Sequence, residues 1–229
     1  SLGAIIRGDS TKKQIALVFT GDEFGDGLTP IANTLQKQKV KGSFYFTGRF
    51  YRNKNFLPGI KKLYAQKNLM GPHSDMHLLY CDWNKRDSTL VTADSLIHDL
   101  FRNEEAMQQA GIQTKDMRTF FIPPYEWWNK EVSRWVQFRY QLFSFTPGTT
   151  SNADYTYPEL GKQYRTSDEI MNNIKRFNES RPGGLNGVVL LIHAGTDPRR
   201  KDKLYNRLDE LIAYLKKQGY QFKRVDEMF

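Results

Sequence analysis

Two histidines, His73 and His77, are the residues of this chain whose type and spacing most clearly suggest chemistry. They lie four positions apart, directly after a Gly-Pro pair. On a helical turn, positions i and i+4 share one face with Cβ atoms roughly 5–6 Å apart, so both rings could reach one cation at ~2.0–2.1 Å. Two ordinary helix-surface histidines are the alternative, and the pair alone does not decide between these interpretations.

Carboxylates and a further histidine follow other predicted strands. Asp22 and Glu23 come soon after residues 14–19, and His193 follows the apolar run at residues 188–192. Two imidazoles and one carboxylate can hold a divalent cation and leave a position open for water. The cation lowers the pKa of that water, while a second carboxylate and a histidine can move protons. This set could hydrolyse an amide or an ester. The alternative is that Asp22 and Glu23 only form a turn and that His193 is structural.

The hydrophobic pattern predicts the elements that would position these groups. Short apolar runs, typical of strands, alternate with longer stretches of helical periodicity. The predicted strands are residues 14–19, 43–47, 68–70, 119–122, 141–145, 188–192 and 221–225. The predicted helices are residues 29–38, 56–67, 92–110, 130–138, 167–178 and 203–217. About seven such units favour a distorted α/β fold, a (β/α) barrel that need not be complete, with its site at the carboxyl ends of the strands.

Length and composition limit the remaining possibilities. We expect residues 1–229 to form a single catalytic domain, and 39% hydrophobic residues suffice for its core. No apolar run is long enough to predict a transmembrane segment, and the single Cys81 excludes an internal disulfide. The net charge of +9 could attract nucleic acid. Because the basic residues are spread along the chain, we interpret them as solvated faces and expect no nucleic-acid partner.

Five segments carry motifs in a fixed order. They are residues 18–23 (VFTGDE), 40–48 (VKGSFYFTG), 73–77 (HSDMH), 122–125 (IPPY) and 191–193 (LIH). The third has the form H-[ST]-x-x-H and the last the form L-x-H. Together these motifs resemble those of the NodB-type polysaccharide deacetylases, carbohydrate esterase family 4. The resemblance covers nearly the whole chain, and the second and third segments are specific in combination.

The resemblance implies a metal-dependent hydrolysis of N- or O-acetyl groups from a polysaccharide or other glycan. Asp22 would be the general base. Glu23, His73 and His77 would bind a divalent metal, with Zn²⁺ as the first expectation. Water bound to that metal would attack the acetyl carbonyl, and His193 would be the general acid.

The resemblance also implies roles for residues around the reacting group. The backbone N–H of Tyr125 would stabilise the oxyanion, and Leu191 would line the acetyl pocket. Asp154 would pair with His193, a solvent-facing loop position being the alternative. Trp127 and Trp128 would line a glycan groove, with core packing as the alternative. The family's usual setting implies a secreted, periplasmic or cell-envelope protein.

Two departures from the family pattern affect these expectations. Glu23 stands where the family has Asp, and Ile122 stands where it has an arginine that pairs with the catalytic aspartate. We therefore expect Asp22 to lack a cationic neighbour and to be less well oriented, since Arg118 is too far along its strand to substitute. These departures leave two alternatives open: a weak or inactive glycan-binding relic, and a hydrolase of non-glycan C–N bonds.

Overall fold

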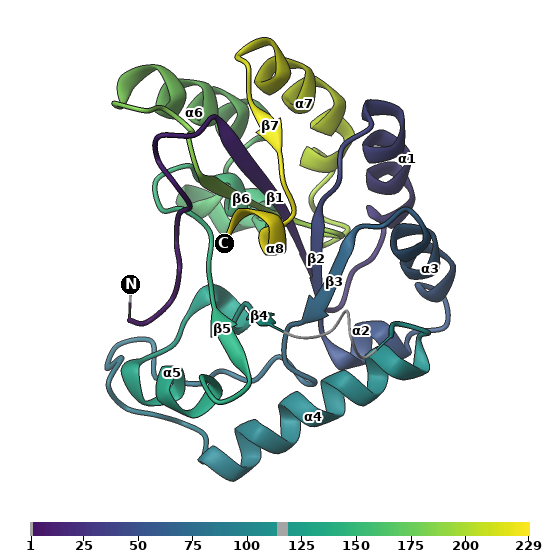
Figure 1. Ribbon diagram of the computed structural model, residues 1–229, viewed down its shortest axis with the longest axis vertical. Helices are drawn as coiled ribbons and strands as arrows, with labels where there is room; N and C mark the ends of the chain where they lie inside the picture. The colour runs from purple at the N-terminus through teal and green to yellow at the C-terminus, as the bar shows by residue number, and fades with distance from the viewer. Residues whose placement is uncertain (1, 114–118) are drawn as a thin grey trace.

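The fold is a distorted (β/α) barrel of parallel strands surrounded by helices (Figure 1), as the sequence predicts. The computed structural model describes residues 2–113 and 119–229, so Arg118 lies outside the described residues. The strands are β1 (Gln14–Gly21), β2 (Ser43–Phe46), β3 (Leu69–Pro72), β4 (Thr119–Phe121), β5 (Tyr140–Leu142), β6 (Val188–His193) and β7 (Gln221–Phe222). They confirm all seven predicted strands.

The strands form two parallel sheets. The larger has the order β3-β2-β1-β6, with β7 also paired to β1, and the smaller consists of β4 and β5. Among the described residues, few backbone hydrogen bonds join the two sheets. One is the hydrogen bond from Thr146 N–H to Val189 O at 3.0 Å. The barrel is therefore a curved sheet with a second sheet set against it.

Helices cover the outside of the larger sheet and the ends of the smaller one (Figure 1). They are α1 (Leu28–Gln38), α2 (Gly48–Arg52), α3 (Leu57–Ala65), α4 (Ala93–Gln109), α5 (Lys130–Val136), α6 (Ser167–Ser180), α7 (Leu208–Lys217) and α8 (Val225–Met228). Short 3-10 turns are η2 (Pro124–Glu126), η3 (Ser151–Tyr155), η4 (Pro158–Gln163) and η5 (Leu204–Arg207). None of the helices in the described residues combines the length and apolar character needed to cross a membrane.

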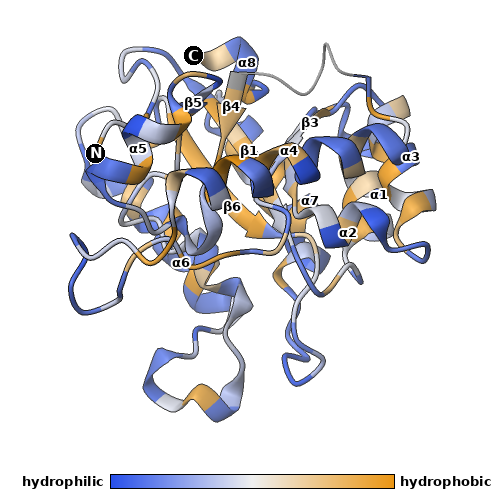
Figure 2. Cartoon of the chain, turned by 90° about the horizontal axis from the view of Figure 1, so that it is seen from below, coloured by the Kyte–Doolittle hydropathy of each residue, from blue (hydrophilic) through white to orange (hydrophobic). Residues whose placement is uncertain are grey.

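The core follows from the alternation of side chains along β1. Ile15, Leu17 and Phe19 pack outward against the helices, in the same apolar cluster as residues of α1 and α7. Ala16 and Val18 point to the opposite face, into a second cluster inside the barrel. Because both faces are buried, the strand reads as one continuous apolar run. Figure 2 shows the hydrophobic strands in the interior and hydrophilic outer faces on the helices.

Two short helices escaped prediction, and the histidine segment differs from the expected helical turn. The sequence pattern did not reveal α2 and α8, which are too short to show a helical period. Residues 73–77 form an irregular turn in which Ser74 and His77 have positive φ, 72° and 56°. The expectation that helical spacing brings the two imidazoles together was therefore wrong, although the rings do meet.

Candidate active site

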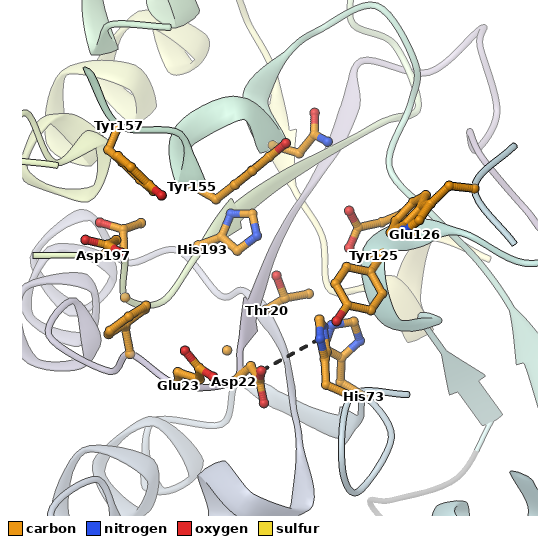
Figure 3. Close-up of a pocket in the computed structure, with 17 residues that line it drawn as sticks. Thr20, Asp22, Glu23, His73, Tyr125, Glu126, Tyr155, Tyr157, His193 and Asp197 are labelled. Carbon is orange, nitrogen blue, oxygen red and sulfur yellow. Dashed lines mark ion pairs between the residues drawn. The ribbon is translucent and has the colours of Figure 1, made fainter. Parts of the chain in front are cut away.

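A cavity of about 500 Å³ opens at the carboxyl ends of β1, β3 and β6 (Figure 3). The sequence analysis predicted a site at this end of the barrel. Walls are added by η2 and η3, which contribute Tyr125, Glu126 and Tyr155. Six of the predicted site residues line the cavity: Asp22, Glu23, His73, His77, Tyr125 and His193.

The histidine turn is fixed by buried side chains of α4. Asn103 Oδ1 accepts a hydrogen bond from the His73 N–H at 2.8 Å. Asp99 accepts two more, from Asp75 N–H at 2.8 Å and from Met76 N–H at 3.0 Å. The bonds from Asp75 and Met76 satisfy backbone donors of the turn, and the His73 N–H also donates to Phe46 O at 3.2 Å. As a result, the two imidazole rings are held with their centroids 5.0 Å apart.

Both imidazoles are neutral at physiological pH. Burial lowers the pKa of His73 to about 3 and that of His77 to about 4. Neutral imidazole is the form that binds metals. His73 Nδ1 donates to Ile122 O at 2.7 Å, which leaves Nε2 with a free lone pair. A ring anchored through one nitrogen and open at the other is the usual arrangement of a metal-binding histidine.

Asp22 is paired with an arginine that the sequence analysis did not identify. Arg49 Nε donates to Asp22 Oδ1 at 2.5 Å, and Arg49 Nη2 donates to Asp22 Oδ2. Thr47 Oγ1 also donates to Asp22 Oδ1, at 3.0 Å. Burial alone would raise the pKa of Asp22, but these bonds and the charge of Arg49 hold it below the usual range. The expectation that Asp22 lacks a cationic neighbour was therefore wrong.

Arg49 compensates for the residue at position 122 from a different part of the fold. It lies at the start of α2, next to Thr47, which caps that helix by accepting from Phe50 N–H at 3.2 Å. Ile122 is buried in the apolar cluster inside the barrel. A threonine two residues before an arginine, directly after a strand, was the signal that could have indicated a cation at this strand end.

The two neighbouring acids are not placed alike. Asp22 Oδ2 lies 3.7 Å from His77 Nδ1. The Glu23 side chain is 62% exposed, and its carboxylate is 3.8 Å from Arg49. Figure 3 shows Asp22 nearer to His73 than Glu23 is. Glu23 is thus at the cavity, but on the side of Asp22 away from the imidazoles.

The donor set suits a divalent cation in chemistry, with some adjustment of position. Two neutral imidazoles and an adjacent carboxylate are ligands that Zn²⁺ prefers. Within residues 2–113 and 119–229, however, no three His, Cys, Asp or Glu side chains are arranged to hold an ion as they stand. The carboxylate groups would have to move, and Glu23, being exposed, has room to do so.

His193 is paired with Asp154 on the opposite side of the cavity. His193 Nδ1 donates to Asp154 Oδ1 at 2.7 Å, and His193 N–H donates to Oδ2 at 2.9 Å. The pairing expected from the sequence is therefore present, and Asp154 is fully buried. Burial by itself lowers the pKa of His193, but the charge and hydrogen bond of Asp154 outweigh it and raise that pKa. The ring nitrogen Nε2 is left free on this side of the cavity.

Tyr125 lies over the histidine turn. Its ring packs on His77 with centroids 4.3 Å apart. Tyr125 and Glu126 both have positive φ, 57° and 50°, which non-glycine residues rarely adopt and which marks a backbone constrained for a purpose. Among the described residues, no acceptor is found for the Tyr125 N–H. That donor is consequently available to a ligand.

The remaining predicted residues are more remote. Leu191 is completely buried inside the barrel and does not reach the cavity wall. Trp127 and Trp128 line a second hollow, of about 420 Å³, that borders the first. Trp83, by contrast, is 52% exposed and lines the main cavity beside Tyr125, with ring centroids 5.4 Å apart.

Acid–base groups gathered at the strand ends of a (β/α) barrel give this protein the organisation of a barrel enzyme. Comparison with known families makes the class specific. The polysaccharide deacetylase family matches residues 7–141, more than half of the chain. The chain belongs to the polysaccharide deacetylase family.

Individual relatives agree with this assignment. The chain is 28% identical over 232 residues to the peptidoglycan-N-acetylmuramic acid deacetylase PdaA of Bacillus subtilis, a match that covers 98% of this chain and 74% of that protein. In structure it is similar to the Bc1960 peptidoglycan N-acetylglucosamine deacetylase, with a TM-score of 0.76, 19% identity and coverage of 99% and 92%. It is also similar to BA3943, a family 4 pseudoenzyme from Bacillus anthracis, with a TM-score of 0.74, 21% identity and coverage of 100% and 69%.

Proposed function

We propose that this protein removes acetyl groups, N- or O-linked, from a glycan of the bacterial cell wall, and that it acts in the cell envelope. Two of the relatives described above are named as peptidoglycan deacetylases. The observation that carries the proposal is one cavity with two neutral imidazoles and Asp22 on one side and the His193–Asp154 pair on the other (Figure 3).

A divalent metal, with Zn²⁺ as first choice, would be held by His73, His77 and one acid of the Asp22–Glu23 pair. When bound, such an ion supplies an activated water and polarises the acetyl carbonyl. We retain Glu23 as the proposed carboxylate ligand and Asp22 as the proposed base. The position of Asp22 beside His77 makes the reverse assignment testable with the same variants.

The protein's own groups then divide the remaining tasks. Arg49 keeps Asp22 ionised, so that Asp22 can accept a proton. The free Tyr125 N–H donates to the oxygen on which negative charge develops, an interaction worth about 3–4 kcal/mol in other enzymes. His193, whose pKa is raised by Asp154, delivers a proton to the departing amine or hydroxyl. Each group already lines the cavity or is hydrogen-bonded to one that does.

The proposal is tested by acetate release combined with zinc binding. Wild type should release acetate from an N-acetylglucosamine oligomer, from peptidoglycan or from a synthetic acetyl ester, and a chelator should abolish the release until zinc is restored. His77→Ala should lose both zinc binding and turnover. Release that continues in His77→Ala or in excess chelator would reject the metal-dependent function.

Glu23→Gln separates the two acids. A loss of zinc affinity like that of His77→Ala supports Glu23 as the ligand, whereas unchanged affinity transfers this role to Asp22.

The similarity to a pseudoenzyme favours one second candidate, a glycan-binding protein without turnover. Zinc and glycan binding without acetate release from any of the three substrates would establish that alternative.

A further inference from the structure

Glu126 is an acidic residue of the cavity wall that the proposed reaction does not use. It is half-buried, and it follows Tyr125 in the 3-10 turn η2. Figure 3 shows its carboxylate pointing into the cavity, on the side of His193. Its backbone N–H donates to Pro123 O at 3.0 Å, and its φ is positive, 50°. The backbone thus holds a carboxylate where a substrate would bind.

Other acids of the site have a cationic partner. Asp22 is paired with Arg49, and Asp154 is hydrogen-bonded to His193. Asp197, at the rim, is bound by Arg199 through two hydrogen bonds of 2.9 and 2.6 Å. Within residues 2–113 and 119–229, the Glu126 carboxylate has neither a hydrogen bond nor an ion pair. A bound ligand would therefore interact with this charge directly, favourably if the ligand donates hydrogen bonds and unfavourably if it is negative.

No cationic side chain among the described residues pairs with the Glu126 carboxylate, although burial affects its protonation. The charges that act on it across the cavity are His193, which lowers its pKa, and Asp154, which raises it. Burial is the largest influence and raises the pKa of Glu126 to about 7. Arg86 lines the second hollow with Glu126, but its Nε donates to Trp128 O at 2.7 Å and its guanidinium stacks 3.8 Å from the Trp127 ring. Glu126 is thus partly ionised at neutral pH.

Glu126 also stands at a boundary. It lines both the main cavity and the second hollow, together with Tyr125 and Asn152. A glycan chain that extends from one space into the other must pass this carboxylate. The overall charge of +9 does not offset it, because the basic residues are distributed over the whole chain.

We propose that Glu126 determines the sugar that this site accepts: a neutral N-acetylhexosamine, whose hydroxyl and amide groups donate hydrogen bonds, and not an acidic sugar. This inference rests on the proposed function. N-acetylmuramic acid carries a lactyl carboxylate, and placing it beside Glu126 would bring two negative charges together in a partly desolvated space. An N-acetylglucosamine residue offers hydrogen-bond donors and no such charge. Among the substrates named for the relatives, the site therefore fits N-acetylglucosamine.

The test compares one neutral and one acidic sugar in the same assay. Wild type is incubated with an N-acetylglucosamine oligomer and with a glycan fragment of alternating N-acetylglucosamine and N-acetylmuramic acid, and mass spectrometry locates each deacetylated sugar. We expect kcat/KM for N-acetylglucosamine to exceed that for N-acetylmuramic acid by at least about tenfold, equivalent to ~1.4 kcal/mol. The ratio should grow from pH 6 to pH 8, because a carboxyl group with a raised pKa ionises over that range.

Matched variants assign the preference to Glu126. Glu126→Gln should bring the ratio to within about threefold and remove its dependence on pH, by raising the rate on N-acetylmuramic acid. Glu126→Asp keeps the charge and should keep the preference. Glu105→Gln makes the same charge change on the exposed face of α4 and should leave the ratio unaltered. Thermal unfolding of each variant confirms that it is folded.

Two results would overturn the inference: equal deacetylation of both sugars by wild type, or an unchanged ratio in Glu126→Gln. If no substrate releases acetate, the proposed function fails, but the inference about Glu126 is still decided. The affinities of wild type and Glu126→Gln for the two intact oligosaccharides, measured by calorimetry, then take the place of kcat/KM. A wild-type preference for the neutral oligosaccharide that Glu126→Gln removes supports it, and its absence rejects it.

Discussion

Replacing Arg49 with alanine tests whether this arginine orients Asp22. The change removes two charge-assisted hydrogen bonds, one of them 2.5 Å long, from a carboxylate that is 20% exposed. Bonds to charged groups contribute about 1.5–3 kcal/mol each. The Arg49 side chain is 38% exposed, so solvent screening reduces the total. We therefore expect a net loss of about 1.5–3 kcal/mol, which lowers kcat/KM by roughly 10- to 150-fold.

The assay is acetate release at saturating zinc, with kcat and KM determined separately. The loss should fall mainly on kcat, because Arg49 holds Asp22 and does not line the cavity. Arg49→Lys keeps the charge but not the two-pronged geometry, and it should retain an intermediate rate.

Arg224 provides a matched control at the opposite end of the barrel. It binds Asp226 through two hydrogen bonds of 3.0 and 2.9 Å, and its side chain is 27% exposed. Arg224→Ala therefore removes a similar ion pair and should leave kcat/KM unchanged. If Arg49→Ala keeps a rate within about threefold of wild type while remaining folded, Arg49 does not orient Asp22 and the reasoning fails.

Three further predictions follow from contacts around the cavity. His77→Ala should abolish acetate release while circular dichroism stays unchanged, since His77 makes no hydrogen bond to another described element. Asp154→Asn removes the carboxylate that raises the pKa of His193 in the folded protein. A raised folded-state pKa stabilises the fold fully below the unfolded value of ~6.5, and this stabilisation is lost as pH rises through the folded-state pKa. In urea unfolding, Asp154→Asn should therefore destabilise the fold most at acidic pH, by about 3 kcal/mol. The alkaline limit of activity should also move to lower pH. Equal destabilisation at pH 5 and pH 9 would contradict this reasoning. Gly71→Ala would place a Cβ 2.3 Å from the Tyr45 ring, so denaturant unfolding should show a loss of about 1–3 kcal/mol, and wild-type stability would show that the ring can move aside.

The strands could be predicted for a physical reason, and the pairing of His193 was expected from resemblance. β1 and β6 are buried on both faces, so their residues form unbroken apolar runs that stand out in the sequence. The pairing of Asp154 with His193 was expected from the family resemblance, with a solvent-facing loop position as the alternative, and the hydrogen bond between them is present. Both features depend on patterns that are local or fixed in order along the chain.

Arg49 and the histidine turn could not be predicted, because neither has a local signature. The helix that carries Arg49 has five residues, fewer than are needed to show a helical period. The turn at residues 73–77 depends on positive φ at Ser74 and His77. Contacts from distant parts of the chain, such as the hydrogen bonds that Asp99 accepts, hold that conformation, and the spacing of the two histidines alone suggests a helix instead.

The hydrogen bond from His73 to Ile122 O has a consequence for recognising lapsed members of this family. It joins the end of β3 to the end of β4, and so links two sheets that few other backbone hydrogen bonds connect within residues 2–113 and 119–229. A descendant that had abandoned hydrolysis would still need His73 to keep that junction closed. His77 makes no comparable hydrogen bond between the sheets, so its loss is the more informative sign that turnover has ceased.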